Sequence, residues 1–189
     1  RATFMVNAVD WLYTRIRLDD EELDLARSII KGFQRKLDMK TGVLTREFTW
    51  CTRTGKEIRV EFTRFLSMKI PELGCQGISL EPLNFTGRID IKVGLDFSPI
   101  HESMQRSLWK CIKQENTEGI TVSLGRSDTS GLMICAGFKI DSEQSFEYKY
   151  FESAKLNGLE LSMELASGNR ASFHKLAVVH AEKKRETEI

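Results

Sequence analysis

Neither charge sign is in excess in this sequence: 28 Lys and Arg residues stand against 27 Asp and Glu, a formal net charge of +1. A nucleic-acid-binding surface needs an excess of basic residues, so this balance argues against DNA or RNA as a partner. No apolar run approaches the ~20 residues of a membrane-spanning helix, and no signal peptide is recognisable. We therefore expect neither nucleic acid nor a membrane as a partner.

Paired cysteine motifs are also missing. The four cysteines, at positions 51, 75, 111 and 135, lie far apart and form no CxxC pair. Zinc ligands usually cluster at short spacing, so we expect no metal site, and we predict no other cofactor. Scattered single thiols fit small buried hydrophobic residues in a reducing compartment, which predicts a cytoplasmic protein.

The sequence lacks the usual catalytic motifs. It contains no GxSxG elbow, no phosphate-binding glycine loop and no HExxH helix. Carboxylates are abundant, but none stands out as a pair that could flank a glycosidic bond. Glu47, Glu57 and Glu61 occupy polar positions of their predicted strands. Lone histidines such as His174 and His180 are far more often structural or solvated than catalytic. We predict no catalytic residue in this chain.

The sequence does contain period-two alternation, most clearly in residues 35–50. Leu44, Phe48 and Trp50 share one parity there, while Thr and Glu residues take the other. A Lys-Thr-Gly turn separates this arm from a second alternating arm, and Gly42 can adopt the positive φ that such a turn needs. The pattern predicts a β-hairpin with one solvent-exposed face. Such a hairpin is not stable alone in water, so other strands must pair with it.

Similar alternation recurs about every ten residues along the rest of the chain, a spacing typical of a β-sandwich or barrel. Residues 21–30 fit a short edge strand with its connection better than a short helix. A change of parity between Phe62 and Phe65 predicts a β-bulge near residues 63–64, or a strand that passes to another sheet. Residues 77–83 and 87–96 are expected to pair through a tight connection. The other expected strands cover residues 12–18, 56–68, 108–113, 119–124, 132–140, 144–151, 156–165 and 170–179.

The length suits a single all-β domain, which we expect over residues 1–181. Residues 182–189 are charged and lack apolar periodicity, which indicates a tail or the start of a linker. The inward parity of the strands predicts the buried residues. These are Leu37, Leu44, Phe48, Ile58, Val60, Phe62, Ile89, Ile91, Val93, Leu132, Ile134 and Phe138.

The alternation breaks over residues 96–109, which we predict to be the longest loop. Loops carry function more often than strands do, and this one holds His101, Met104 and Trp109. We therefore expect His101 and Trp109 to contact a carbohydrate or a partner domain. Exposed tryptophans, here Trp11 or Trp109, can stack on a sugar ring. For Trp109 we favour a second explanation: it leads directly into residues 110–112, which resume a strand pattern, so it begins the next strand and packs into the sandwich, with the loop as a cover.

Six ordered segments carry a resemblance to a known family. They read VNAVDWL (6–12), LDMKTGVLTREFTW (37–50), RFLSM (64–68), PLNFTGRIDI (82–91), GLD (94–96) and HKLAVV (174–179). In these segments the chain resembles the N-terminal domain of glycoside hydrolase family 65. That family includes maltose, kojibiose and trehalose phosphorylases and some trehalose hydrolases.

The resemblance implies a large twisted antiparallel β-sandwich of about 10–13 strands, a galactose-mutarotase-like supersandwich, followed by a helical linker and an (α/α)6-barrel. The barrel would hold the general-acid glutamate and the phosphate site for inverting phosphorolysis of an α-linked glucosyl disaccharide. This chain would then be a non-catalytic N-terminal domain whose partner is the absent barrel. A homodimer of the parent is also expected, with disaccharide and phosphate bound only through the parent. The family's first strands would precede Arg1, and FSPIHES (97–103) replaces its glycine-containing turn.

Two other functions fit the same fold. An autonomous carbohydrate-binding module would stack sugars on its aromatic residues. A structural or oligomerisation sandwich would bind no ligand. The segment expected before Arg1 and the charged tail favour the N-terminal domain over both.

Overall fold

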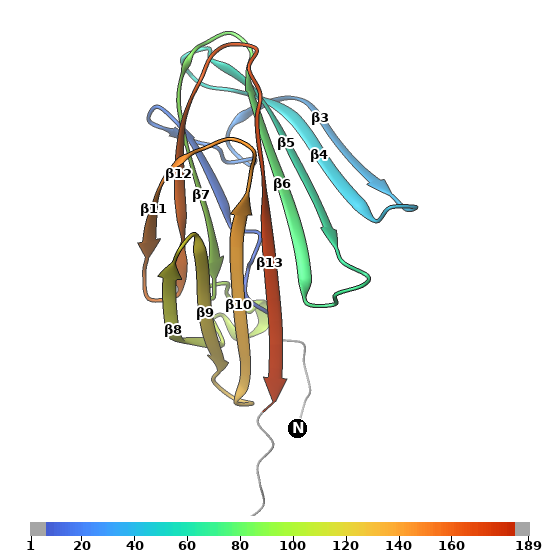
Figure 1. The fold of residues 1–189 in the computed structure, drawn as a ribbon, viewed down its shortest axis with the longest axis vertical. Coiled ribbons are helices and arrows are strands. Elements are labelled where there is room, and N and C mark those ends of the chain that lie inside the picture. The colour runs from blue at the N-terminus through green and yellow to red at the C-terminus, as the bar shows by residue number, and fades with distance from the viewer. Residues whose placement is uncertain (1–6, 184–189) are drawn as a thin grey trace, which may run out of the picture.

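The computed structural model describes residues 7–183, which form two antiparallel β-sheets packed against each other (Figure 1). The strand order is β11-β12-β7-β1-β2 in the five-stranded sheet and β3-β4-β5-β6-β13-β10-β9-β8 in the eight-stranded sheet. The expected all-β sandwich is thereby confirmed. The strands are β1 (Thr14–Leu18), β2 (Glu21–Glu22), β3 (Ile29–Asp38), β4 (Val43–Cys51), β5 (Glu57–Leu66), β6 (Leu73–Pro82), β7 (Gly87–Asp96), β8 (Trp109–Thr117), β9 (Ile120–Ser127), β10 (Leu132–Asp141), β11 (Glu147–Glu152), β12 (Leu156–Leu165) and β13 (Ala171–Lys183).

Helical structure is minimal in residues 7–183: it consists of one short 3-10 helix, η1 (Glu102–Met104). No helix of this described part is long and apolar enough to span a membrane. The last strand, β13, continues to Lys183 near the C-terminus of the chain. Residue 182 is therefore still paired in the sheet, with Met133. The strand therefore runs two residues past the boundary expected at residue 181, and residues 184–189 of the expected tail lie outside the described residues.

The predicted hairpin is present as β3 and β4. Gly42 has a φ of 71°, and its N–H donates to the carbonyl of Asp38 at 2.8 Å. Phe48 and Trp50 at the base of the hairpin are buried, but Leu37 near its tip is 53% exposed. In Figure 1 the hairpin extends sideways from the body of the sandwich. The prediction that Leu37 is buried is therefore wrong, because the shorter sheet does not cover the hairpin tip.

The connection after β6 crosses between the sheets. The expected pairing of residues 77–83 with 87–96 is wrong, because β6 pairs with β5 and β13 while β7 lies between β12 and β1. Inward side chains of both strands, such as Ile78 and Ile91, belong to one core cluster. The two strands thus contribute to the core from different sheets instead of standing side by side.

The predicted bulge near residues 63–64 is also absent. β5 pairs with β4 and β6 in continuous register, so Phe65 simply faces away from Phe62 and is 41% exposed. Register shifts occur instead in β3, between Lys31 and Gln34, and in β8 after Cys111. The shift in β3 contains a glycine with a φ of 63° at position 32, a conformation that suits a bulge.

The core confirms most of the burial prediction. Leu44, Phe62 and Leu132 are half-buried at its edge. The predicted residues that are buried are Phe48, Ile58, Val60, Ile89, Ile91, Val93, Ile134 and Phe138.

The cysteines follow the prediction of small buried residues only in part. Cys51 and Cys75 are buried, whereas Cys111 is half-buried and Cys135 is exposed. Cys135 is exposed because its neighbours in β10 take the inward positions of the alternation.

Candidate functional site

The loop between β7 and β8 closes one end of the sandwich. The carbonyl of His101 accepts hydrogen bonds from the backbone N–H groups of Met104 and Gln105, at 3.1 and 2.8 Å. Arg106 ties the loop to the β9–β10 connection through an ion pair of 2.8 Å with Asp128. His101 is half-buried, and Met104 is 43% exposed. The loop therefore offers part of its surface to solvent while its backbone is held in place.

Trp109 lies inside this end of the sandwich. Its side chain is 2% exposed, and its ring packs against Phe97 with centroids 5.7 Å apart. The indole N–H donates to the carbonyl of Asn7. Trp109 thus begins β8 and packs into the core, as the favoured explanation predicted. Contact of His101 and Trp109 with a carbohydrate or partner domain stays a prediction.

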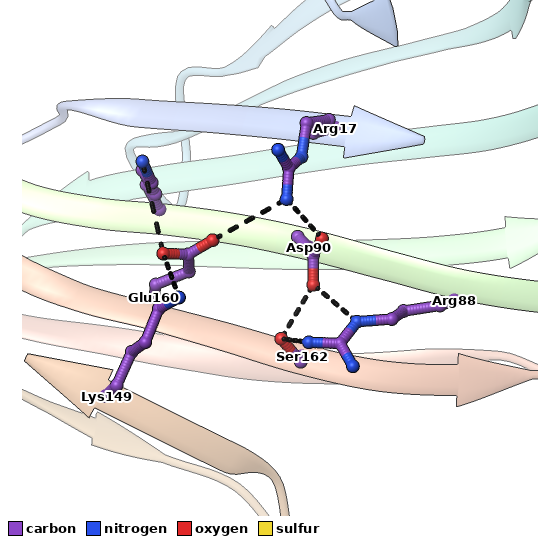
Figure 2. A network of polar contacts seen from close by, with 7 residues as sticks. Arg17, Arg88, Asp90, Lys149, Glu160 and Ser162 are labelled. Carbon is purple, nitrogen blue, oxygen red and sulfur yellow. Dashed lines mark hydrogen bonds and ion pairs between the residues drawn. The ribbon is translucent and has the colours of Figure 1, made fainter. Parts of the chain in front are cut away.

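Close carboxylates occur together on the outer face of the five-stranded sheet (Figure 2). Asp90 of β7 accepts hydrogen bonds from Arg17 at 2.8 Å, Arg88 at 3.0 Å and Ser162 at 2.6 Å. Glu160 of β12 is surrounded by the cations of residues 17, 92 and 149, at 3.9, 4.0 and 3.2 Å. The network joins four neighbouring strands, β1, β7, β12 and β11.

The electrostatics of this network oppose acid catalysis. Despite partial burial, the hydrogen bonds from Ser162, Arg17 and Arg88 lower the pKa of Asp90 to about 2. A glycosidase needs one carboxyl group that remains protonated until it donates its proton to the leaving oxygen. Asp90 is fully ionised at neutral pH, and Glu160 is held by three cations. We interpret the network as a strand-joining cluster of charges.

Lys175 is a buried cation that the sequence analysis did not single out. It occupies an inward position of β13 between Phe173 and Ala177, and its side chain is fully buried. Its ammonium donates to the carbonyls of Trp11 and Gly94, both at 2.6 Å. Burial lowers the pKa of Lys175 to about 7, against the opposing effect of the nearby Asp10 carboxylate. A lysine enclosed in this way joins the two sheets and has no access to a substrate.

A cleft of about 450 Å³ opens between the sheets at the hairpin end. One wall is the inner face of β3, β4 and β5, and the other is the segment around β1 and β2. Arg35, Arg46 and Arg64 line it together with Gln76. Arg46 shares the inward parity of Phe48 and Trp50, so a cation at an apolar position was the signal that sequence reasoning missed. The same signal marks Lys175 in β13.

The family model for the glycosyl hydrolase family 65 N-terminal domain matches residues 1–189, the whole chain. The chain belongs to this family. Among the part of this family 65 domain that the structure describes, no group of three or more His, Cys, Asp or Glu residues could hold a metal ion. This is the family that the six sequence segments indicated.

Several curated relatives of this family 65 domain are phosphorylases. It is 34% identical over 92 residues to the alpha,alpha-trehalose phosphorylase of Thermoanaerobacter brockii, a match covering 49% of this chain and 12% of that protein. It is 30% identical over 99 residues to the kojibiose phosphorylase of Halothermothrix orenii, covering 52% of this chain and 13% of the relative. The matched part of the chain thus spans only about an eighth of the length of these relatives.

A solved structure has the same fold as this family 65 domain. It is provisionally described as a kojibiose phosphorylase from the human microbiome, and it superposes with a TM-score of 0.87 at 22% identity. The match covers 97% of this chain and 24% of that chain. At this identity the likeness establishes the sandwich fold alone.

Proposed function

We propose that this chain is the non-catalytic N-terminal β-sandwich domain of a disaccharide phosphorylase, whose other domains carry out inverting phosphorolysis of an α-linked glucosyl disaccharide. The observation that carries the proposal is the family match over all 189 residues, together with curated relatives named as trehalose and kojibiose phosphorylases. The charge network supports a non-catalytic role, because Asp90 is ionised far below neutral pH. A cytoplasmic location is part of the same proposal.

The hairpin supplies a surface for contact with the rest of such an enzyme. Phe33, Leu37 and Met39 are 49%, 53% and 84% exposed, an unusual concentration of apolar side chains on one projecting element. Exposed apolar patches of this kind mark interaction sites. We propose that the catalytic domain of the parent covers this hairpin, since the matched relatives are about eight times longer than the region they share with this chain. The homodimer expected for the parent remains a second partner in the proposal.

The test compares this chain with the longer protein that carries it. Each is incubated with kojibiose, trehalose or maltose, with and without inorganic phosphate, and the release of a hexose 1-phosphate is measured. We expect phosphate-dependent release by the longer protein and none by the 189-residue chain. Turnover by the purified short chain would contradict the non-catalytic assignment. Phosphate-independent release of free sugar by the longer protein would show that its reaction is hydrolysis and not phosphorolysis.

A carbohydrate-binding module is the second candidate, and one observation favours it. Tyr148 and Tyr150 lie on the edge strand β11, 53% and 36% exposed, with their rings packed edge to face at 5.8 Å. Exposed aromatic rings of this kind can stack on sugars. Isothermal titration of the short chain with the same three disaccharides separates the candidates. Saturable heat that Tyr148→Ala removes supports the module, while its absence supports the scaffold domain.

A further inference from the structure

The inter-sheet cleft contains a cluster of three arginines. Arg46 of β4 stands directly opposite Arg35 of β3, and Arg64 of β5 stands opposite Leu44, one step along the same inner face. Like charges directly opposite each other, here Arg35 and Arg46, destabilise a sheet, and a bound anion would offset this repulsion. None of the three forms an ion pair with a carboxylate within residues 7–183. The cluster thus has the charge of an anion site without a protein anion in it.

Contact with an aromatic ring keeps the Arg46 side chain inside the cleft. Its guanidinium lies 4.9 Å from the centroid of the Phe62 ring, which holds it in place within the cleft. The side chain is half-buried, and burial lowers its pKa, with smaller contributions from Arg64 and Arg35. A partly desolvated guanidinium beside two others gains most from an anion that receives hydrogen bonds from more than one of them.

The carboxylates on the opposite wall form no ion pair with these three arginines among the described residues, and each has another hydrogen-bond or ion-pair partner. Asp10 accepts a hydrogen bond from the N–H of Leu12 at 2.9 Å. Glu22 pairs with Arg15 at 3.3 Å. Asp24 accepts from the N–H of residue 26 at 2.9 Å and lies 3.7 Å from the side chain of residue 27. The carboxylates of one wall therefore already have partners, whereas the three arginines of the other wall have no carboxylate paired with them within residues 7–183.

Gln76 provides a second, independent indication of a ligand. This residue of β6 is only 5% exposed, and it lines the cleft beside Arg64, its cross-strand neighbour. Its Nε2 donates to the hydroxyl of Thr14 at 3.1 Å, but its buried Oε1 has no hydrogen-bond partner among the described residues. A buried acceptor without a donor destabilises the protein, and a hydrogen bond from a ligand hydroxyl would remove that destabilisation.

We propose that this cleft binds a small phosphate ester that also carries hydroxyl groups, with the phosphate on Arg35, Arg46 and Arg64 and a hydroxyl on Oε1 of Gln76. Arginine matches phosphate oxygens with paired N–H groups, and a dianion suits three cations better than a single carboxylate does. A cavity of about 450 Å³ is within the range of small-molecule sites. The proposal uses only residues of this chain and is independent of the proposed function.

The test is isothermal titration of the 189-residue chain with glucose 6-phosphate, inorganic phosphate and glucose. We expect saturable binding of the hexose phosphate, weaker binding of inorganic phosphate and none of glucose. Arg46→Met and Arg64→Met should each weaken binding of both anions at least about tenfold. Gln76→Met should weaken the hexose phosphate alone, because inorganic phosphate brings no sugar hydroxyl to Oε1. Arg126→Met, an exposed arginine on β9, is the matched control and should change neither.

Several results would overturn the proposal. They are the absence of saturable heat with either anion, equal binding of glucose and its phosphate, and unchanged affinities in both arginine variants. Arg64 is exposed, so its variant is expected to fold and to keep the test interpretable if the buried Gln76 variant does not. A structure of the longer protein in which carboxylates of another domain pair with Arg46 and Arg64 would overturn it as well. Such a result would leave the proposed function intact.

Discussion

Lys175 of β13 donates a hydrogen bond to the carbonyl of Gly94 in β7, at 2.6 Å, and so connects the two sheets from within the core. A second bond, to the carbonyl of Trp11, fixes the segment that leads into β1. The ammonium also lies 4.4 Å from the centroid of the Phe138 ring. Three elements distant in sequence thus meet at one buried cation.

Lys175→Met should change the pH dependence of stability. Burial lowers the pKa of Lys175 from 10.5 to about 7 in the folded protein, so between these values the unfolded chain binds more protons. Stability of the wild type therefore rises with pH across this window, by up to about 1.4 kcal/mol per pH unit from this group alone. Urea unfolding at pH 6.5, 8 and 9.5 should show the wild type gaining stability relative to the variant. A constant difference at all three values would mean that the lysine titrates normally.

Asp90→Asn should destabilise the domain by about 2 kcal/mol at neutral pH, from a pKa lowered from 3.8 to about 2. A carboxyl group with a lowered folded-state pKa stabilises the protein above its unfolded value, and this contribution disappears as pH falls from about 4 to 2. The wild type and the variant should therefore converge in stability at low pH. Lys113→Ala, which removes an exposed ion pair with Glu115, is the control and should cost less than about 1 kcal/mol. Equal losses of stability in both variants would mean that the Asp90 network contributes no more than an ordinary ion pair on the surface.

Phe48→Ala should cost about 3–5 kcal/mol, because the side chain is 1% exposed and packs between Phe33 and Phe62. Leu37→Ala in the same hairpin should cost well under 1 kcal/mol in this chain, because Leu37 is half in solvent. Chemical denaturation of the two variants tests whether the core covers only the base of the hairpin, where Phe48 lies, and not its tip. A large loss for Leu37→Ala would show that the tip is covered in solution.

Alternation along the chain was enough to predict most strands, and residues 87–96 coincide with β7. It could not assign strands to sheets, because the parity of a strand does not depend on its neighbour. This is why β6 and β7 were paired wrongly. The prediction that Leu37 is buried was wrong for a related reason. A residue on the inner face of a sheet is buried only where the opposite sheet extends over it. Lys175 and Arg46 sit at apolar positions, a visible signal whose meaning depends on partners that only the fold provides.

Gly158→Ala should strongly destabilise the domain. Gly158 of β12 pairs with Gly94 of β7, and a methyl group there would lie 2.8 Å from the Gly94 Cα and still closer to the carbonyl of Val93. Backbone atoms of a central strand cannot move aside, so we expect a loss of about 3 kcal/mol or more in thermal or chemical unfolding. Gly137→Ala in β10 is the control, because its nearest contacts would be ordinary, at 3.4 and 3.5 Å. Similar stabilities of the two variants would show that β7 and β12 can separate.

His101 and Met104 give the last prediction, which concerns the loop that closes the end of the sandwich. Met104 is 43% exposed and Ile100 is 62% exposed, so the loop presents apolar surface on a backbone held by its own hydrogen bonds. If this loop contacts the catalytic domain or a second subunit of the parent, a double change of His101 and Met104 to Ala should lower kcat/KM or shift the oligomeric state. This double change should leave the free energy of unfolding of the isolated chain within about 0.5 kcal/mol of the wild-type value.

The measurement uses the longer protein for kcat/KM and for size-exclusion chromatography with light scattering, and the short chain for stability. Trp109→Phe is the contrasting variant, because Trp109 is buried and its indole N–H bonds to the carbonyl of Asn7. Losing that bond should lower stability by about 1–3 kcal/mol whether or not the loop contacts a partner. Unchanged activity and assembly in the His101 and Met104 double variant would leave the loop as a cover over the core, with Trp109 as the residue that anchors it.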